Sequence, residues 1–448
     1  MHHRAALITT VVALSSILPA PSAKAAAGDI DTTFSSDGWA ITAEVRPDPN
    51  TAFHPKGIED IAVQPDGKIV AVGEIRGWNY EQHFGVFRYT RDGELDPSFG
   101  NGGWTIDDFS TSEFPRSVEL QKDGKIVVSG DMTCGDWTIG FFSCFTMVRY
   151  NVDGLRDATF GQAGVAQSLF GVLGPGLDDM AIQDDGKIVA VGSTGNYGPD
   201  RYVNSGFTHV IRYRSDGSLD SSFSGDGRVS IDIGKGFERG HAVQIQRDGK
   251  IVVAGESFEN FAVVRLRPNG RLDRRFSRDG KQTVDFGVNR QDYAYSLDIQ
   301  SDGRLLLAGI TKPHPNSAGG VPRIALARLN RNGSLDGTFA RGGKRIMKPA
   351  PYGGYALAVM QHPDRRILVA GVGYMDATVG LQTDIVLARY RVNGTPDPAF
   401  GGDGIVTVNR NPQDGASALG IQPDGKIITS GGLSYQSTAQ VLLRYHAM

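Results

Sequence analysis

Gln64-Pro65-Asp66-Gly67-Lys68, followed by the apolar residues 69–72, is the stretch that decides the fold, because the chain repeats it about every 60 residues. The motif Gln-x-Asp-Gly-Lys begins at Gln64, Gln121, Gln183, Gln246, Gln300 and Gln422, with Arg in place of Lys in the fifth unit. The sixth unit carries a variant, His362-Pro363-Asp364-Arg365-Arg366. Seven copies in 448 residues predict a repeat architecture in which each unit is one supersecondary element.

Two more anchors recur in every unit. The first is an arginine followed by Tyr or Leu, at Arg88, Arg149, Arg212, Arg265, Arg328, Arg389 and Arg444. The second is Asp-x-x-Phe, which begins at Asp31, Asp96, Asp157, Asp220, Asp273, Asp336 and Asp397. In six units the Asp comes 8 residues after the Arg, with Asp-Gly or Asn-Gly between them. Such pairs are strong signals for a tight hairpin turn, so the Arg and Asp segments belong to neighbouring strands of one sheet.

One unit contains four strand patterns. Residues 117–121 alternate, residues 125–129 are rich in β-branched side chains, residues 145–150 form a third strand and a fourth begins at Val165. The second strand is apolar on both faces, so both faces need cover. Radially packed blades provide it, whereas a β-solenoid has shorter repeats and needs capping units. The expected fold is therefore all-β, a seven-bladed β-propeller of four-stranded antiparallel blades.

The ends of the chain indicate how the ring closes. The last unit stops soon after Arg444 and has no fourth strand, whereas residues 28–38 match the fourth-strand segment of the other units. We therefore expect residues 38–43 to pair with the strand that ends at Tyr445 and to complete the last blade. This closure removes two exposed sheet edges. Residues 26–448 are expected to form a single propeller domain.

The recurring residues, as in 62–70 (AVQPDGKIV) and 95–100 (LDPSFG), resemble the bacterial delta-60 repeat, and the resemblance extends over residues 28–446. The unit is also similar to the NHL-type repeat. Both resemblances imply a β-propeller. The delta-60 resemblance implies no general activity and no catalytic residues, and no cofactor is expected. The departure at His362 and Arg365 bears only on the turn of the sixth unit.

The N-terminus has the pattern of a secretory signal peptide. A weakly basic start, residues 2–4, precedes an apolar run over residues 5–18, and residues 23–25 (Ala-Lys-Ala) fit a cleavage site. Residues 1–25 are therefore expected to be removed. The apolar run is too short to span a membrane, and no later stretch approaches the required length. The sequence predicts an exported protein, periplasmic or extracellular, with no transmembrane segment, and we expect a monomer.

Cys134 and Cys144 are the two cysteines of the chain and lie in one irregular segment. In an oxidising compartment, two cysteines this close in sequence predict a disulfide. The alternative is two free thiols. A metal site at this position is disfavoured, because two cysteines without a nearby histidine supply too few ligands.

The repeated Arg and Asp residues, as in Arg88 and Asp96, are interpreted as structural pairs, because their offset stays constant while neighbouring loops change length. A guanidinium can hold a carboxylate through two hydrogen bonds, which would fix the turn. Ring closure would give Arg444 the partner Asp31. The Asp of each Gln-x-Asp-Gly-Lys turn is interpreted as a turn former rather than a calcium ligand, since each turn supplies only one. No metal site is predicted.

Loop lengths indicate one face of the propeller as the binding face. The link between the second and third strands varies in length, as does the link from each fourth strand to the next unit, and both emerge on the same face. Candidate ligand-binding residues on this face are Trp78, Tyr80, His83, Trp137, Tyr197, Tyr202, Arg239, His241, Tyr293 and Tyr355. Aromatic side chains among polar ones suit contacts with a glycan or a peptide. The alternative is that the loops fold over their own aromatic residues.

Two classes of function stay open. The chain has 46 Lys and Arg residues against 49 Asp and Glu residues and no basic stripe, so nucleic acid is not an expected partner. It carries no G-x-S-x-G, HExxH or phosphate-loop motif. The first class is a binding or scaffold protein, and the second is an exported hydrolase or lyase with a site at the mouth of the central channel. Converging His, Asp, Glu or Arg would favour the enzyme, and a shallow aromatic surface would favour binding.

Overall fold

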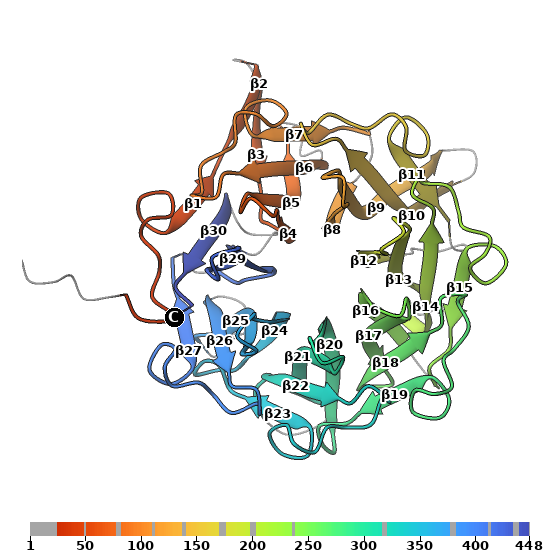
Figure 1. The fold of residues 1–448 in the computed structure, drawn as a ribbon, viewed down its shortest axis with the longest axis vertical. Helices are drawn as coiled ribbons and strands as arrows, with labels where there is room; N and C mark the ends of the chain where they lie inside the picture. Colours follow the sequence, from red (N-terminus) through yellow and green to blue (C-terminus); the bar gives the residue numbers. More distant parts are fainter. Residues whose placement is uncertain are drawn as a thin grey trace, which may run out of the picture.

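The structure, a computed structural model, forms a ring of antiparallel sheets around a central axis (Figure 1). The described residues form seven sheets, so the predicted seven-bladed β-propeller is confirmed. The expected signal peptide falls almost entirely outside the described part of the chain. No helix in the described part is long and apolar enough to cross a membrane. The described residues are 25–48, 51–77, 82–109, 113–136, 140–169, 176–197, 203–234, 238–315, 320–376, 382–410, 414–432 and 439–447.

Each blade has four strands, which follow one another outward from the central axis (Figure 1). Blades 1 to 3 contain β4 (Asp60–Val63), β5 (Ile69–Arg76), β6 (Gln82–Tyr89) and β7 (Trp104–Asp107); β8 (Glu113–Leu120), β9 (Ile126–Asp136), β10 (Gly140–Tyr150) and β11 (Val165–Ser168); and β12 (Gly176–Ile182), β13 (Ile188–Tyr197), β14 (Val203–Tyr213) and β15 (Arg228–Ile231). Blades 4 to 6 contain β16 (Glu238–Ile245), β17 (Ile251–Ser257), β18 (Asn260–Leu266) and β19 (Lys281–Val284); β20 (Arg290–Ile299), β21 (Leu305–Pro313), β22 (Arg323–Leu329) and β23 (Lys344–Met347); and β24 (Gly354–Gln361), β25 (Ile367–Tyr374), β26 (Thr383–Tyr390) and β27 (Ile405–Val408).

Blade 7 joins the two ends of the chain. It contains β28 (Leu419–Ile421), β29 (Ile427–Gly431) and β30 (Gln440–Tyr445), and its outer strand is β1 (Trp39–Thr42) from the N-terminal segment. Strand β1 runs antiparallel to β30, with Trp39 opposite Leu443 and Thr42 opposite Gln440. The predicted closure by residues 38–43 is therefore confirmed.

The repeated turn between the first two strands depends on a left-handed backbone conformation. In blade 1, Gly67 has a φ of 88° and its N–H donates to the carbonyl of Gln64. In the sixth unit Arg365 takes this position with a φ of 71°, and its N–H donates to the carbonyl of His362 in the same way. The variant turn thus has the same shape as the others, although a residue with a side chain costs about 1–2 kcal/mol relative to glycine in the left-handed conformation.

The link into blade 1 contains an added hairpin. Strands β2 (Val45–Asp48) and β3 (Thr51–Pro55) pair with each other, and β3 continues onto β5. The hydrophobic core lies between the blades, as where Val70 of blade 1 and Val128 of blade 2 belong to one buried cluster. Each middle strand is covered on both faces, as its apolar sequence predicts.

Each repeated arginine joins its own blade to the next one. Nε donates to the predicted Asp in all seven units, as in Arg88–Asp96 at 2.7 Å. Nη1 donates instead to a backbone carbonyl in the segment that follows the third strand of the next blade, which is a turn in six blades and the C-terminal end of the chain in blade 7. The expected two-bond grip on Asp is therefore replaced by one bond to Asp and one across the blade boundary. The guanidinium also lies over the Phe of the Asp-x-x-Phe motif, as in Arg88 and Phe99 at 4.6 Å.

The Arg444–Asp31 pair connects the two ends of the chain. Arg444 Nε lies 2.7 Å from Asp31 Oδ2, and Nη1 donates to the carbonyl of Arg91 in blade 1 at 2.8 Å. Both side chains are buried, with 1% exposed. Burial opposes ionisation of Asp31, but hydrogen bonds from Lys426 and Thr33, together with the charge of Arg444, hold its pKa below the usual range.

The two cysteines form the predicted disulfide. Cys134 lies on β9 and Cys144 on β10, and their Cα atoms are 5.9 Å apart. The two strands are consecutive and hydrogen-bonded to each other, so the bond fastens the outer end of one hairpin of blade 2.

We expect Arg444→Ala and Asp31→Ala each to lower the free energy of unfolding by about 3–5 kcal/mol, because each breaks a buried ion pair. The double variant should be no less stable than either single variant, as measured by urea denaturation. Lys122→Ala, which breaks an exposed pair with Asp184, is the control and should cost less than about 1 kcal/mol. Additive losses at Arg444 and Asp31 would show that the two side chains act independently.

Candidate functional site

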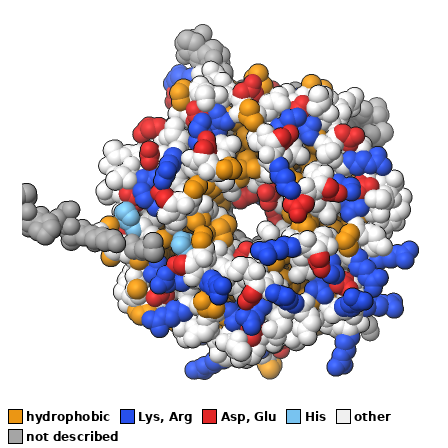
Figure 2. Space-filling view, in the orientation of Figure 1, with side chains coloured by type: hydrophobic (Ala, Val, Ile, Leu, Met, Phe, Trp, Pro, Cys, Tyr) orange, Lys and Arg blue, Asp and Glu red, His pale blue; other side chains and the backbone are white. Residues whose placement is uncertain are grey.

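The inner strands of the seven blades line a central cavity of about 560 Å³. The first strand of each blade borders the channel and pairs with only one neighbouring strand, so its other edge needs partners or cover. Figure 2 shows the opening at the centre of one face, with carboxylates on part of its rim and hydrophobic side chains beside it. The residues at this inner edge form the candidate site.

Five inner strands carry a β-bulge, in each case five residues before the anchor of the repeat. The register shifts by one residue in β8, β12, β16, β20 and β24. The bulged residues are Arg116, Asp178, His241, Tyr295 and Leu357, and all five line the cavity. A bulge leaves one residue unpaired and redirects its side chain, so the same irregularity presents a different functional group in each blade.

Side chains four residues before the anchor, one residue after the bulged position, connect neighbouring blades. Asp60 Oδ2 accepts the N–H of Val118 at 2.9 Å, and Asp179 Oδ2 accepts the N–H of Val243 at 2.8 Å. Ser117 Oγ donates to Asp179 Oδ1 at 3.0 Å. Each contact crosses from one blade to another and satisfies polar groups of an inner strand edge. These carboxyl groups therefore support the ring as well as facing the channel.

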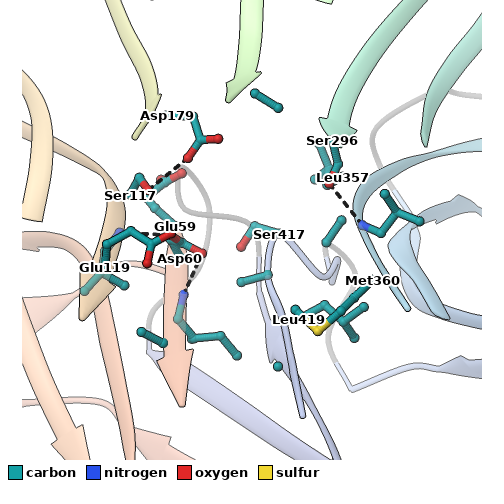
Figure 3. A pocket seen from close by; sticks show the side chains of 18 of the residues that line it. Glu59, Asp60, Ser117, Glu119, Asp179, Ser296, Leu357, Met360, Ser417 and Leu419 are labelled. Atoms are coloured by element: carbon teal, nitrogen blue, oxygen red, sulfur yellow. Dashed lines mark hydrogen bonds between the residues drawn. The ribbon is translucent and has the colours of Figure 1, made fainter. Parts of the chain in front are cut away.

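The cavity has two chemically different walls (Figure 3). Glu59, Asp60, Glu119 and Asp179 lie on one side and are called the carboxyl wall. Leu357, Met360 and Leu419 lie across from them and are called the apolar wall. The carboxyl wall comes from blades 1 to 3 and the apolar wall from blades 6 and 7. A ligand in the cavity would meet hydrogen-bonding groups on one side and hydrocarbon on the other.

The carboxyl wall holds protons more tightly than free carboxylic acids do. Burial raises the pKa of Asp60 to about 6. Burial and the charge of Asp60 raise the pKa of Asp179 to about 7. Burial and the charges of Asp179 and Asp60 raise the pKa of Glu119 to about 8. At neutral pH the wall therefore contains both protonated and ionised carboxyl groups, which can donate and accept hydrogen bonds.

A charged cluster adjoins the carboxyl wall at the end where the inner strands begin. His241 Nδ1 lies 3.6 Å from Asp178 Oδ1, and its Nε2 lies 3.8 Å from Glu256 Oε2. Arg239 also pairs with Asp178, at 3.0 Å. Burial favours the neutral ring, but Asp178 and Glu256 outweigh it and raise the pKa of His241 to about 8. Burial would raise the pKa of Asp178, but His241 and Arg239 have the larger effect and lower it. These four residues are called the channel mouth.

Aromatic rings continue from the channel mouth around blades 4 to 6. The ring of His241 lies 5.2 Å from that of Tyr295, and Tyr295 lies 6.3 Å from Tyr355. Tyr355 is in turn 5.9 Å from Tyr374, and Tyr293 contacts Tyr295 at 6.4 Å. The four tyrosines are half-buried, so part of each ring is accessible. They form a continuous aromatic arc beside the cavity.

The structure brings together four of the ten predicted ligand-binding residues. Arg239, His241, Tyr293 and Tyr355 surround the channel mouth and the aromatic arc. His83 lies apart from them, between blades 1 and 2, and does not line the central cavity. The remaining candidates cannot be placed: Trp78, Tyr80, Trp137 and Tyr202 lie outside the described residues, and Tyr197 lies in β13 with its side chain outside them.

Sequence reasoning missed the carboxyl wall, Asp178 and Tyr295. All of these are on or directly beside inner strands, whereas the variation in loop length pointed to the loops. Aligning the units on the anchor shows a signal that could have found them. Four residues before it, blades 1 and 3 carry Asp60 and Asp179, where the other units carry only Ala or Ser. The position one residue earlier varies between blades and carries charged or aromatic residues in most of them, among them Asp178 and Tyr295.

Comparison with known families identifies the repeat. A profile described as "Domain of unknown function (DUF5122) beta-propeller" matches residues 64–99, 121–160, 183–223, 246–276, 300–339 and 362–400, just over half of the chain. The chain belongs to this family. A search of curated protein sequences gave no match.

Similar solved structures include several propeller enzymes. The polysaccharide lyase Uly1 is 11% identical with a TM-score of 0.46, covering 88% of this chain and 90% of that one. A PL25 ulvan lyase is 11% identical with a TM-score of 0.46, covering 92% and 96%. The NanB sialidase of Streptococcus pneumoniae is 8% identical with a TM-score of 0.41, covering 88% and 68%. Likeness at this level does not transfer a function to the DUF5122 protein.

The raised pKa of Glu119 predicts a pH-dependent stability. Between the pKa of an unfolded glutamate and about 8, the folded state binds more protons than the unfolded state, so stability falls as pH rises. Glu119→Gln should remove this loss and stabilise the protein by about 1–3 kcal/mol at pH 8, with little change at pH 4. Urea denaturation across this range measures the effect.

A matched control is Asp184→Asn, which changes an exposed carboxylate in the turn of blade 3 and should leave the pH dependence unaltered. Blade 4 carries Gln244 at the position of Glu119, which shows that the repeat accommodates an amide there. If the free energy of unfolding changed with pH in the same way for wild type and Glu119→Gln, the raised pKa of Glu119 would be contradicted.

Proposed function

We propose that this DUF5122 propeller is a binding protein that takes a neutral or amine-bearing glycan at its central cavity. The observation that carries the proposal is the division of one cavity into a carboxyl wall and an apolar wall, with the aromatic arc beside them. A sugar ring has the same division, since hydroxyl groups project from its edge and C–H groups from its faces. Pockets of a few hundred Å³ with a few convergent polar groups are typical of small-ligand sites.

The charges favour a glycan without carboxylate or sulfate groups. The cations near the cavity are already paired: Arg239 and His241 face Asp178 and Glu256, and Arg116 lies 3.5 Å from Asp131. The carboxyl wall has no such cations opposite it among the residues that line the cavity. An anionic ligand would therefore meet an excess of negative charge, whereas hydroxyl or ammonium groups would meet acceptors.

The proposal includes the place where the protein acts. We propose that residues 1–25 are a signal peptide, and that residues 26–448 act as a monomeric propeller of delta-60 repeats in the periplasm or outside the cell. The Cys134–Cys144 disulfide supports this, because such bonds persist in oxidising compartments. The peptide alternative is tested together with the glycans below.

Isothermal titration with neutral, amino and uronic oligosaccharides and a mixed peptide library tests the binding proposal. The neutral or amino sugars should bind and the uronic sugars should not. Tyr295→Ala should weaken binding by about tenfold through loss of the aromatic contact. Asp184→Asn, an exposed change in a turn, should leave the affinity unaltered. Preferential binding of uronic sugars or peptides, or an unchanged affinity in Tyr295→Ala, would contradict the proposal.

A second candidate function is glycan hydrolysis. The convergence of charged side chains at the channel mouth favours it, as does one further observation. Asp178 and Asp179 are consecutive residues that both line the cavity, because Asp178 occupies the bulge. Their environments move the two pKa values apart, with Asp178 lowered and Asp179 raised to about 7. One ionised and one protonated carboxyl group supply a base and an acid, which are the two roles that glycoside hydrolysis needs.

Hydrolysis is tested by incubating each bound glycan with the protein and measuring new reducing ends. If the protein is a hydrolase, Asp178→Asn and Asp179→Asn should each lower the rate by at least about 100-fold while binding persists. The absence of new reducing ends with every glycan that binds would leave binding as the function.

A further inference from the structure

A second site lies between blades 1 and 2, separate from the central cavity. His83 is on β6, Asp108 follows β7 and Glu113 begins β8. One ligand atom from each of these three side chains lies within 4.8 Å of the other two. None of the three residues lines the central cavity, and the proposed glycan site does not involve them.

The strand register sets the first pair. Phe84 of β6 lies opposite Asp107 of β7, so His83 and Asp108 occupy the next opposed positions. Directly opposed residues of an antiparallel pair project on the same face and lie close together. His83 Nδ1 is 3.6 Å from Asp108 Oδ1, which is just beyond hydrogen-bonding distance.

His83 is buried and one of its nitrogens lacks a partner. The residue is 4% exposed, and Nδ1 makes no hydrogen bond within the described structure. Leaving a buried polar atom unpaired is unfavourable, so its position is consistent with a ligand bound there. The ring is held edge-on against Phe53 of β3, with 5.6 Å between centroids. The added hairpin therefore fixes the direction of the unpaired nitrogen.

Glu113 is held in place by the backbone. Its Oε1 accepts the N–H of Phe109 at 2.6 Å and its Oε2 accepts the N–H of Phe84 at 3.3 Å. These bonds orient the carboxylate, as hydrogen bonds from the surroundings commonly do for metal-ligating carboxylates. Asp108, in contrast, has an exposed side chain that can adjust to a third partner.

We propose that His83, Asp108 and Glu113 bind a divalent first-row transition-metal ion, with Zn²⁺ as the probe. One imidazole nitrogen and two carboxylates are ligands that such ions accept, whereas calcium and magnesium prefer oxygen alone. Two donors on one tetrahedral zinc, each at about 2.1 Å, lie roughly 3.4 Å apart. The donor atoms here reach that spacing with small side-chain movements. Three protein ligands leave a fourth position for water or a substrate atom.

The boundary between blades 3 and 4 has the same two carboxylates without the histidine. Between blades 3 and 4, Phe207 occupies the position of His83, while Asp232 and Glu238 occupy those of Asp108 and Glu113. Glu238 likewise accepts backbone N–H groups, from Ile233 and Gly234. The two carboxylates thus also occur together at a boundary that has no histidine. An imidazole added to such a pair gives a three-ligand site.

Equilibrium dialysis with Zn²⁺, after chelator treatment of the mature protein, tests the site. We expect one zinc per chain with a micromolar or tighter Kd. His83→Ala and Asp108→Asn should each weaken binding at least tenfold. Asp232→Asn, the same change at the boundary without a histidine, should leave zinc binding unaltered. Bound zinc should also raise the melting temperature of wild type but not of His83→Ala.

Melting curves of the metal-free variants establish that each is folded. Asp108 is exposed and Asn has nearly the same shape as Asp, so Asp108→Asn is expected to fold. This variant therefore still tests the site if His83→Ala does not fold. The proposal is overturned if wild type binds no stoichiometric zinc, or if Asp108→Asn binds zinc as tightly as wild type.

Discussion

Each blade of this propeller is joined to the next through one buried arginine, on which the rest of the structure depends. Its Nε bonds the aspartate of its own blade, its Nη1 bonds a carbonyl of the following blade, and its plane covers a phenylalanine. A guanidinium is suited to this because its donors point in fixed, different directions. Seven such links follow one another around the ring, and the seventh, from Arg444, reaches back to blade 1. Closure between the chain ends is therefore the same interaction as every other blade boundary.

The arginines connect the blades at their outer turns, so they do not cover the edges of the inner strands, which face the channel. These edges would expose unpaired backbone groups, and Asp60, Asp179 and Ser296 bond several of them across blade boundaries. The bulge one residue earlier adds a side chain that the sheet does not need for pairing. Pairing of the inner strand edges thus requires polar side chains in the channel, and the bulges allow each blade to present a different side chain beside them. The candidate site consists of these two sets of side chains.

The unequal distribution of charge around the channel has a direct chemical consequence. Blades 1 to 3 contribute the carboxyl wall, and blades 4 to 6 contribute the aromatic arc. Low solvent access raises the pKa of the carboxyl groups instead of leaving them all ionised. A wall of this kind can exchange hydrogen bonds with hydroxyl groups at neutral pH. The asymmetry of the ring, rather than any single residue, defines the ligand class we propose.

The sequence by itself determined the number of blades, the four-strand unit, the closing strand, the disulfide and the Arg–Asp partners. All of these follow from short motifs or from their spacing, because turns and strand periodicity act over a few residues. It did not show that Arg88 bonds Asp96 only once, since the second acceptor lies in another blade. Nor did it show the bulges, the carboxyl wall or the meeting of His83 with Glu113. These depend on residues about 30 to 120 positions apart being brought together by the packing of one blade against another, and on a register shift that no local pattern encodes. Only the tertiary structure decided them, because distances between blades are set by packing of the whole ring.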